Sequence, residues 1–296
     1  MKSPREPALL RRVATPSRRS PWRCLVFVFA FVLTRAAKAD QPAAQAVATE
    51  TTTEARQELP QAGENPISGL DSATFQLGFN GALGPFKRTQ PEFELDPVIP
   101  IGITQRLTLI ATLVLPFKGI PDITNRSGTE WGFGDVNPTF LMAIQFGEFF
   151  LGPGVNLVAP TASDAVIGQG KWQLGPALAF IWFTKLIVAG FQATQAYSLG
   201  GDGSRPDVSN FKLQPLFFLN LPEGTFLVTS PLIQHDWKQS DWIVPVGGGV
   251  GKLVQLGTQA ANVNLQVFWN AAAPAVGPTW RVQFQLQLLF PERAKH

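Results

Sequence analysis

The chain alternates apolar and polar side chains with a period of two along most of its length. From Arg281 to Leu288, Val, Phe, Leu and Leu alternate with Arg and three Gln residues. Residues 262–270 repeat the pattern, with Val263, Leu265, Val267 and Trp269 set against Asn262, Asn264 and Gln266. Because successive side chains of a strand point to opposite faces, this alternation predicts strands with one apolar and one polar face.

Twelve segments fit this pattern, and most are 10–13 residues long. Strands of soluble proteins average about 5–6 residues, whereas a tilted strand that crosses a bilayer needs about 9–11. The lengths therefore favour a membrane barrel over a soluble β-sandwich, which is the alternative. The segments lie near residues 74–82, 92–101, 106–116, 134–146, 149–160, 171–183, 186–198, 209–221, 225–237, 241–253, 261–271 and 279–290.

The connections between these segments alternate in length. Those after odd-numbered strands are mostly long, at 83–91, 117–133, 161–170, 199–208 and 272–278, with a shorter one at 238–240. Those after even-numbered strands are mostly short, at 102–105, 147–148, 184–185, 222–224 and 254–260. Outer-membrane barrels have short periplasmic turns and long outer loops, and an even strand number places both termini on the periplasmic side.

We therefore predict an all-β fold, a closed antiparallel transmembrane β-barrel of about 12 strands. Hydrocarbon offers no hydrogen-bond partners, so a membrane-spanning sheet has to close on itself. Apolar residues would face lipid, and Gln, Asn, Thr and Gly would face the lumen. Six tryptophans fall near predicted strand ends, where aromatic girdles sit in such barrels. They are Trp172, Trp182, Trp237, Trp242, Trp269 and Trp280.

Prolines inside the proposed strands stand against this prediction. Each removes a hydrogen bond from the ladder, so proline is normally confined to edges and bulges. Misplaced boundaries or frequent bulges would reconcile them with a barrel. The six are Pro138, Pro153, Pro176, Pro215, Pro231 and Pro245.

The ends of the chain read as accessory segments. Basic residues, an apolar run at 24–33 and Ala37-Lys38-Ala39 follow the order of a secretory signal, which predicts a signal peptide at 1–39. Residues 40–70 are predicted to be a flexible periplasmic lead-in, 71–291 the barrel and 292–296 a tail. Nine of the 24 basic residues lie in 1–39, leaving 15 against 20 acids beyond it. The basic balance thus belongs to the signal and predicts no nucleic-acid partner.

Charged residues at positions of one strand parity are candidates for the lumen. Glu92, Glu94 and Asp96 alternate with Phe93 and Leu95, so they should line the lumen as an acidic file. Basic residues elsewhere could face inward and complement it. Such a set would tune ion selectivity or, equally, form a static ion-pair network that plugs the bore. The basic candidates are Lys212, Lys252 and Arg281.

Long loops can fold into the outer mouth of a barrel and set its specificity. The loops Lys118–Trp131, Thr161–Gly170 and Gly200–Val208 are the candidates. The candidate site residues in these loops, on weak evidence, are their aromatic residues and three charged residues of the last loop. The charged residues are Asp202, Arg205 and Asp207.

Other chemical motifs in the sequence point to ordinary structural roles. Gly247–Lys252 (GGGVGK) resembles a phosphate-binding loop, but Val246 and Leu253 fail its two flanking requirements, so a barrel strand is favoured. Ser230 and His235 could suggest a hydrolase, yet their opposite parity places them on opposite faces of a regular strand. Few His and Cys residues are present, so we expect no metal site, no cofactor and no catalytic residues.

Several short segments together resemble one family of Gram-negative outer-membrane proteins. They are Gly132–Asp135 (GFGD), Gly152–Thr161 (GPGVNLVAPT), Gly168–Ala177 (GQGKWQLGPA), Ser204–Val208 (SRPDV), Asp241–Leu253 (DWIVPVGGGVGKL) and Leu288–Pro291 (LLFP). The family is named for the meta-cleavage pathway of phenol degradation. The resemblance implies an outer-membrane channel for a small, apolar or aromatic solute. The chain departs from the usual ending of outer-membrane barrels, an aromatic residue at or near the C-terminus, because six residues follow Phe290.

The function expected from the sequence is passage of a small solute across the outer membrane of a Gram-negative bacterium. The expected partners are the solute, outer-membrane lipid and the barrel-insertion machinery. Two alternatives remain open. One is an outer-membrane lipid hydrolase, and the other is a structural or binding barrel with a plugged lumen.

Overall fold

A computed structural model describes residues 71–104, 106–257 and 259–290. The predicted signal peptide, lead-in and tail lie outside these residues. Within them, the chain forms fourteen strands and one short 3₁₀ turn, η1 (Pro222–Gly224). The strands are β1 (Asp71–Leu83), β2 (Arg88–Thr104), β3 (Leu107–Pro121), β4 (Thr129–Phe133), β5 (Asn137–Phe146), β6 (Phe149–Val158), β7 (Lys171–Phe183), β8 (Ile187–Gly201), β9 (Ser209–Asn220), β10 (Thr225–Thr229), β11 (Ile233–Asp236), β12 (Asp241–Leu256), β13 (Gln259–Ala272) and β14 (Trp280–Phe290).

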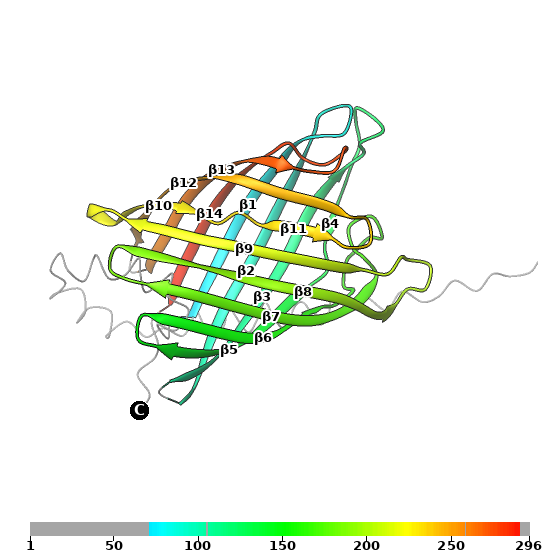
Figure 1. The fold of residues 1–296 in the computed structure, drawn as a ribbon. Coiled ribbons are helices and arrows are strands. Elements are labelled where there is room, and N and C mark those ends of the chain that lie inside the picture. Colours follow the sequence, from blue (N-terminus) through cyan, green and yellow to red (C-terminus); the bar gives the residue numbers. More distant parts are fainter. Residues whose placement is uncertain (1–70, 105, 258, 291–296) are drawn as a thin grey trace, which may run out of the picture. The chain divides into compact units, whose positions relative to one another are not determined.

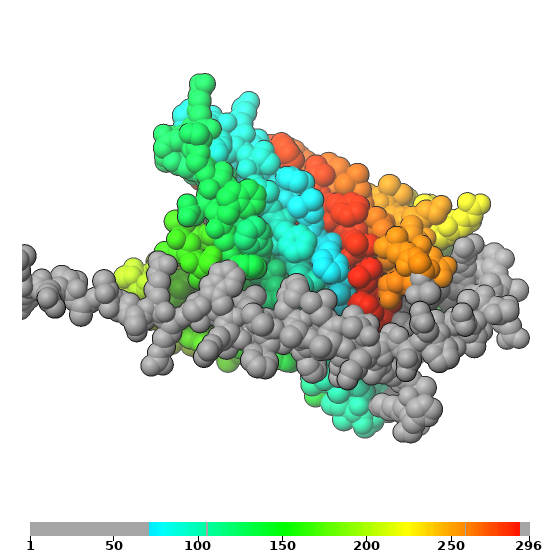
Figure 2. Space-filling view, turned by 180° about the vertical axis from the view of Figure 1, so that it is seen from behind, coloured from blue at the N-terminus to red at the C-terminus, as the bar shows by residue number. Residues whose placement is uncertain are grey.

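These strands form one closed antiparallel sheet. Each barrel strand pairs with the next along the chain, and β1 pairs with β14 from Asp71↔Phe290 to Gly81↔Trp280, which closes the circle. Figure 2 shows the first strand, in cyan, directly beside the last strand, in red. β4 and β5 both pair with β3, and β10 and β11 both lie between β9 and β12 (Figure 1). In the described ranges the fourteen strands therefore occupy twelve positions, as the sequence predicts.

The alternation in sequence decides which side chains face out. On β13, Leu265 and Val267 are 49% and 54% exposed, whereas the intervening Gln266 is fully buried. Directly opposite residues on paired strands share a face, and Leu265 lies opposite both Val250 and Phe284. Both of those side chains are also exposed. The barrel thus has an apolar outer face that fits hydrocarbon and an inner face rich in amides.

Aromatic side chains gather at both ends of this outer face. Trp269 and Trp280 lie opposite each other near the ends of β13 and β14, on the side of the longer loops. Trp182 lies opposite Phe149 at the other end. Trp237 and Trp242 flank the turn after β11 and are exposed. This distribution is typical of the two interfacial girdles of a membrane barrel.

The prolines are accommodated in two ways. Pro231 falls in the break between β10 and β11, and Pro245 follows a register shift in β12. The others keep their place in the ladder, as Pro153 does opposite Leu178. The boundaries of the predicted strand 225–237 are therefore wrong, because it is two strands separated by residues 230–232.

Strands on the long-loop side extend further than the alternation predicts. β3 continues to Pro121, β2 begins at Arg88 and β8 reaches Gly201. The predicted loops 83–91, 117–133 and 199–208 are therefore too long, and the connections are 84–87, 122–128 and 202–208. Backbone pairing continues there because ladder hydrogen bonds do not depend on apolar alternation, as the pair Glu92↔Lys118 illustrates.

The inner face is divided between two kinds of side chain. Toward the short turns, inward apolar side chains of β3 and β5–β10 pack together, with Phe150, Phe226 and Ile110 almost fully buried. On β13 and β14 most inward positions carry amides, and on β1 they carry Ser72, Thr74, Gln76 and Asn80. One wall of the interior is therefore largely polar, interrupted by the buried Phe268 and Leu289, while the facing wall becomes apolar toward the short turns.

Among the described residues, no helix has both the length and the apolar character needed to cross a membrane.

Candidate functional site

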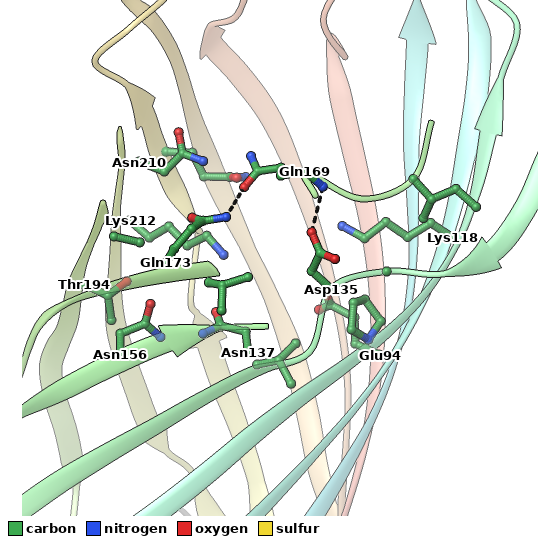
Figure 3. A pocket seen from close by; sticks show the side chains of 17 residues that line it. Glu94, Lys118, Asp135, Asn137, Asn156, Gln169, Gln173, Thr194, Asn210 and Lys212 are labelled. Atoms are coloured by element: carbon green, nitrogen blue, oxygen red, sulfur yellow. Dashed lines mark hydrogen bonds between the residues drawn. The ribbon is translucent and has the colours of Figure 1, made fainter. Parts of the chain in front are cut away.

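A cavity of about 220 Å³ lies inside the barrel, toward the long loops (Figure 3). Strands β2, β3, β5–β9 and β11 contribute to its wall, and the connection between β6 and β7 closes one side. Its charged lining residues are Glu94, Lys118, Asp135 and Lys212. Its uncharged polar lining residues are Asn137, Asn156, Gln169, Gln173, Thr194, Asn210 and Gln234. Its apolar lining residues include Val114, Pro116, Val158 and Ile167.

The connection 159–170 folds inward, because Ile167 and Gln169 line the cavity together with strand residues of the lumen. Asp135, between β4 and β5, holds this segment. Its Oδ1 accepts a hydrogen bond from the backbone N–H of Ala162 (3.1 Å), and its Oδ2 accepts one from the N–H of Gln169 (2.7 Å). A carboxylate that accepts two backbone N–H groups makes strong, charge-assisted bonds. Asp135 is therefore the latch of the inward loop.

Close packing against β4 fixes the same loop. A Cβ added to Gly132 would lie 2.1 Å from Ser163 Oγ and 2.7 Å from Ile167 Cδ1. The N–H of Ser163 also donates to the carbonyl of Phe133 (2.9 Å). Glycine at 132 thus lets the loop approach the strand, which gives a physical reason for the GFGD segment noted in the sequence.

The three predicted loop candidates contact protein groups around this loop. Arg205 donates from Nη2 to the carbonyl of Gly168. Asp207 Oδ1 lies 3.5 Å from Lys171 Nζ. Asp202 is exposed, and hydrogen bonds from the Ser204 side chain and backbone hold its pKa below the usual value. Arg205 and Asp207 thus brace loop 202–208 against the inward loop and the start of β7.

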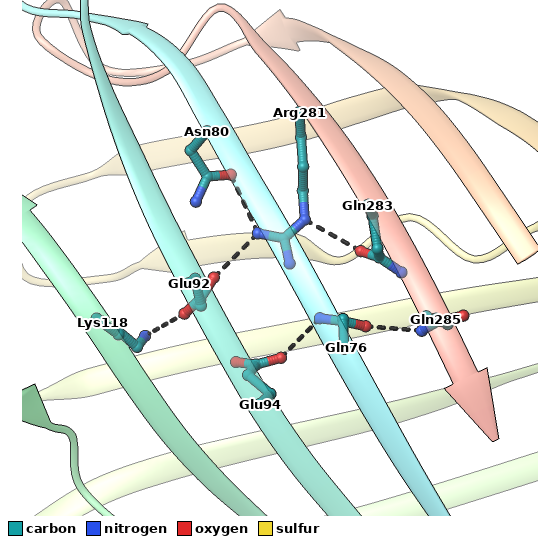
Figure 4. Close-up of polar contacts among 8 residues, drawn as sticks. All are labelled: Gln76, Asn80, Glu92, Glu94, Lys118, Arg281, Gln283 and Gln285. Carbon is teal, nitrogen blue, oxygen red and sulfur yellow. Dashed lines mark hydrogen bonds and ion pairs between the residues drawn. The ribbon is translucent and has the colours of Figure 1, made fainter. Parts of the chain in front are cut away.

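The acidic file on β2 lies on the lumen side, as the parity predicts, and its first member is ion-paired. Glu92 Oε1 lies 2.6 Å from Lys118 Nζ, and its Oε2 lies 3.0 Å from Arg281 Nη1 (Figure 4). Arg281 also donates to Asn80 and to Gln283, at 3.0 Å each. This cluster joins four neighbouring strands, β3, β2, β1 and β14.

Amides continue the polar wall from this cluster. Gln76 Nε2 donates to Glu94 Oε2 (2.7 Å), and Gln285 Nε2 donates to Gln76 Oε1 (2.6 Å). Asn264 and Gln266 both donate to Gln285 Oε1, at 3.1 and 3.3 Å. The result is a hydrogen-bonded ladder over β2, β1, β14 and β13 (Figure 4 shows its first three members). Such ladders rigidify the wall because each amide is held by a neighbour.

The remaining inward candidates differ in their contacts. Buried Asp96 Oδ1 has no hydrogen-bond partner among the described residues. Lys212 on β9 lines the cavity from the far wall and makes no ion pair within 4.0 Å with any described carboxylate. Of the charged file and its proposed complement, only Glu92 and Arg281 thus form a direct pair in the described part of the chain.

Lys252 does not face the lumen, so that prediction is wrong. It lies opposite Val263 on β13, which belongs to the outward file, and two residues from the exposed Val250. Its neighbour Gly251 faces inward instead, where an added Cβ would lie 2.3 Å from the Phe226 ring. Position 252 sits near the short-turn end of β12, where a lysine can reach the polar interface. GGGVGK is a paired barrel strand.

Three residues central to the cavity are not among the individual candidates that the sequence suggests. Lys118 falls in a predicted loop, but it belongs to β3 and pairs with Glu92. Asp135 and Gln169 lie within the GFGD and GQGKWQLGPA segments, which were noted only for resemblance. Lys118 could have been predicted to face the lumen if the strand had been extended, since it is an even number of residues from the inward Thr112 on the same strand. The contact between Asp135 and Gln169 depends on a loop fold that no local pattern encodes.

The residues that suggested a hydrolase lie on opposite faces of the wall. Ser230 points inward, and its Oγ and N–H both donate to Gln266 Oε1 (3.2 and 3.0 Å). His235 lies opposite Phe211 and stacks on Trp242, with ring centroids 4.1 Å apart. A nucleophile and its base have to be within hydrogen-bond reach, and these two are not. Across the described ranges, no group of three potential metal ligands was found either.

Comparisons with known proteins agree with the fold. No family model matches the sequence, and no curated protein matches it. Among solved structures, an outer membrane channel from Pseudomonas putida F1 matches with a TM-score of 0.60 and 15% identity, over 75% of this chain and 96% of that one. The NanC porin matches with a TM-score of 0.49 and 10% identity, over 74% of this chain and all of the porin. The chain has the fold of an outer-membrane β-barrel.

Proposed function

We propose that this protein is a channel that passes a small solute across the outer membrane of a Gram-negative bacterium. The observation that carries the proposal is a polar cavity inside a closed barrel, next to an amide ladder on β13, β14, β1 and β2. A wall of hydrogen-bonding groups can replace the water around a solute as it moves. The likeness to a solved outer-membrane channel supports the same function.

The finer parts of the proposal concern orientation, solute and selectivity. We propose that the short turns are periplasmic and that the inward loop 159–170 lies at the outer mouth. The proposed solute is small and has an apolar or aromatic part, as the resemblance to the phenol meta-cleavage family implies. Glu94, Asp96 and Lys212 are the proposed selectivity residues of the bore, together with the ion-paired Glu92 and Arg281. Outer-membrane lipid and the insertion machinery are the proposed partners.

Ion conductance tests the channel. The protein would be extracted from outer membranes in detergent, verified as a barrel by its heat-dependent gel shift, and added to planar lipid bilayers. We expect discrete current steps, with a reversal potential in a salt gradient that reports the lumen charges. A verified barrel that conducts no ions would contradict the channel and favour the binding barrel with a plugged lumen. The inward apolar side chains Phe150, Phe226 and Phe268 would then be the plug.

A hydrolase receives no support from the geometry, and we propose that the protein is not an enzyme. The same detergent preparation offers a direct check with phospholipid as substrate. Release of fatty acid that disappears in His235→Ala would overturn this view, because the outward His235 would then have a chemical role.

A further inference from the structure

The far wall of the cavity carries a row of side chains with spare hydrogen-bond donors. Thr194 on β8 lies opposite Lys212 on β9, and Lys212 lies opposite Gln234 on β11. All three line the cavity. Within the described residues, none of the three side chains has a hydrogen bond or ion pair. A hydroxyl, an ammonium and an amide side by side make a surface that can donate to an anion.

Other charged groups of the cavity are already engaged. Lys118 pairs with Glu92, and both oxygens of Asp135 hold backbone N–H groups of the inward loop. Glu94 accepts from Gln76 through Oε2. Lys212 is therefore, among the lining residues described, the cation available to a solute. Figure 3 shows its side chain reaching into the cavity from the wall that faces Glu94 and Lys118.

An apolar surface lies within the same cavity. Val114 and Pro116 of β3 and Ile167 of the inward loop contribute to its lining. Along β9 the inward side chains change from Lys212 through Gln214 to Leu216 and Phe218, and the last two belong to the apolar interior. A solute bound at Lys212 would thus meet polar donors at one end, and its body could contact the apolar side chains of Val114, Pro116 and Ile167 within an otherwise polar lining.

We infer that the cavity binds a small organic carboxylate with an apolar body. The carboxylate would accept from Lys212 Nζ, supported by Thr194 and Gln234, and the apolar body would contact Val114, Pro116 and Ile167. Charge-assisted bonds from an ammonium to a carboxylate are the strongest that this lining can offer. The negative charge of Glu94 on the facing wall repels an anion and so limits its affinity, and removing that charge should strengthen the binding. The inference deepens the proposed channel function by naming its solute class.

Equilibrium dialysis of radiolabelled benzoate against the detergent-extracted protein tests this inference. Benzyl alcohol has the ring without the charge, and acetate has the carboxylate without the ring. We expect benzoate to bind at least about tenfold more tightly than either, since each lacks one half of the interaction. Equal binding of benzoate and benzyl alcohol would show that no anion site exists.

Three variants locate the site. Lys212→Met keeps the length of the side chain and should weaken benzoate binding by about tenfold or more, with benzyl alcohol unchanged. Glu94→Gln should strengthen benzoate binding. Lys252→Met is the matched control, because Lys252 lies on the outer face and its loss should change neither ligand. Benzoate binding that survives Lys212→Met would overturn the inference.

Conductance of the same preparation separates this inference from the channel proposal. Current steps without benzoate binding would leave the channel standing and reject the carboxylate site. Benzoate binding at Lys212 without current steps would reject the channel and retain the site in a binding barrel. Lys212→Arg provides a further check, because a restored cation should recover most of the benzoate affinity if charge is the cause.

Discussion

At the scale of single residues, the lumen is defined by which charges are already paired. Glu92 has two cationic partners, one from β3 and one from β14, and its side chain is 9% exposed. Glu94 has one amide partner, and Lys212 has none among the described residues. The two glutamates of β2 therefore have different roles: Glu92 holds neighbouring strands together, whereas Glu94 faces the cavity. Lys212 faces the same cavity from β9.

Glu92→Gln should change both stability and selectivity. Two cations, Lys118 and Arg281, would lose their shared counter-charge, so we expect a loss of about 1–3 kcal/mol in the free energy of unfolding. The bore gains one positive charge, which should shift the reversal potential in a salt gradient toward anion selectivity. Denaturant titration and bilayer recording measure the two effects. Glu94→Gln is the control for stability, since it also removes one negative charge, but from a residue whose only partner is an amide that a glutamine oxygen can still accept from. Equal stability of the two variants would contradict the bridging role of Glu92.

At the scale of elements, the inward loop depends on three segments that are distant in sequence. Asp135 follows β4, the loop itself joins β6 to β7, and Arg205 belongs to the connection after β8. Asp135 and Arg205 belong to the short segments GFGD and SRPDV, and the middle of the loop lies between two others, GPGVNLVAPT and GQGKWQLGPA. Contacts among these distant segments thus build the mouth of the cavity.

Asp135→Ala should release the inward loop. Two backbone N–H groups, of Ala162 and Gln169, would lose their acceptor while the barrel strands stay paired. We expect higher single-channel conductance or more frequent current fluctuation, with the heat-dependent gel shift retained. Asp202→Ala is a suitable comparison, because Asp202 is exposed and its carboxylate bonds Ser204 in its own turn. Currents of Asp135→Ala that match those of the parent would show that the loop stays in place without its latch.

At the scale of the whole molecule, the barrel is stable only where its apolar outer face meets hydrocarbon. The outward residues of β13 and β14 are apolar over their full central length, and the aromatic side chains lie toward the ends. A charge placed at mid-depth on this face would enter the hydrocarbon, while one near the end would reach water or headgroups. The depth of a substitution should therefore decide its cost.

Leu265→Arg should destabilise the barrel in a bilayer by about 2–4 kcal/mol, because position 265 is near the middle of β13. Ala271→Arg, on the same face near the end of the strand, should cost about 0–1 kcal/mol. The measurement is the free energy of unfolding in guanidinium, with the barrel folded in phospholipid vesicles. Equal costs at the two positions would contradict a membrane embedded along the length of β13.

The alternation along the chain was sufficient to predict most strands, their outward faces and the closed barrel, because a period of two is a local property of any sheet with two unlike faces. Its errors fell where local pattern carries no information. The break at Pro231 and the longer β3 depend on neighbouring strands, and the outward Lys252 depends on its partner Val263.

The organisation of the lumen depends on contacts between residues far apart in the sequence. The pairing of Glu92 with Arg281 joins residues 189 positions apart, and the latch of Asp135 on Gln169 joins residues 34 apart. Closure of the sheet brings the first and last strands together, and the contacts of the inward loop depend on how its backbone packs against the strands around it. The odd or even position of a charged residue along its strand can place its side chain in the lumen. Which partner it contacts there depends on the stagger of all the strands between the two residues.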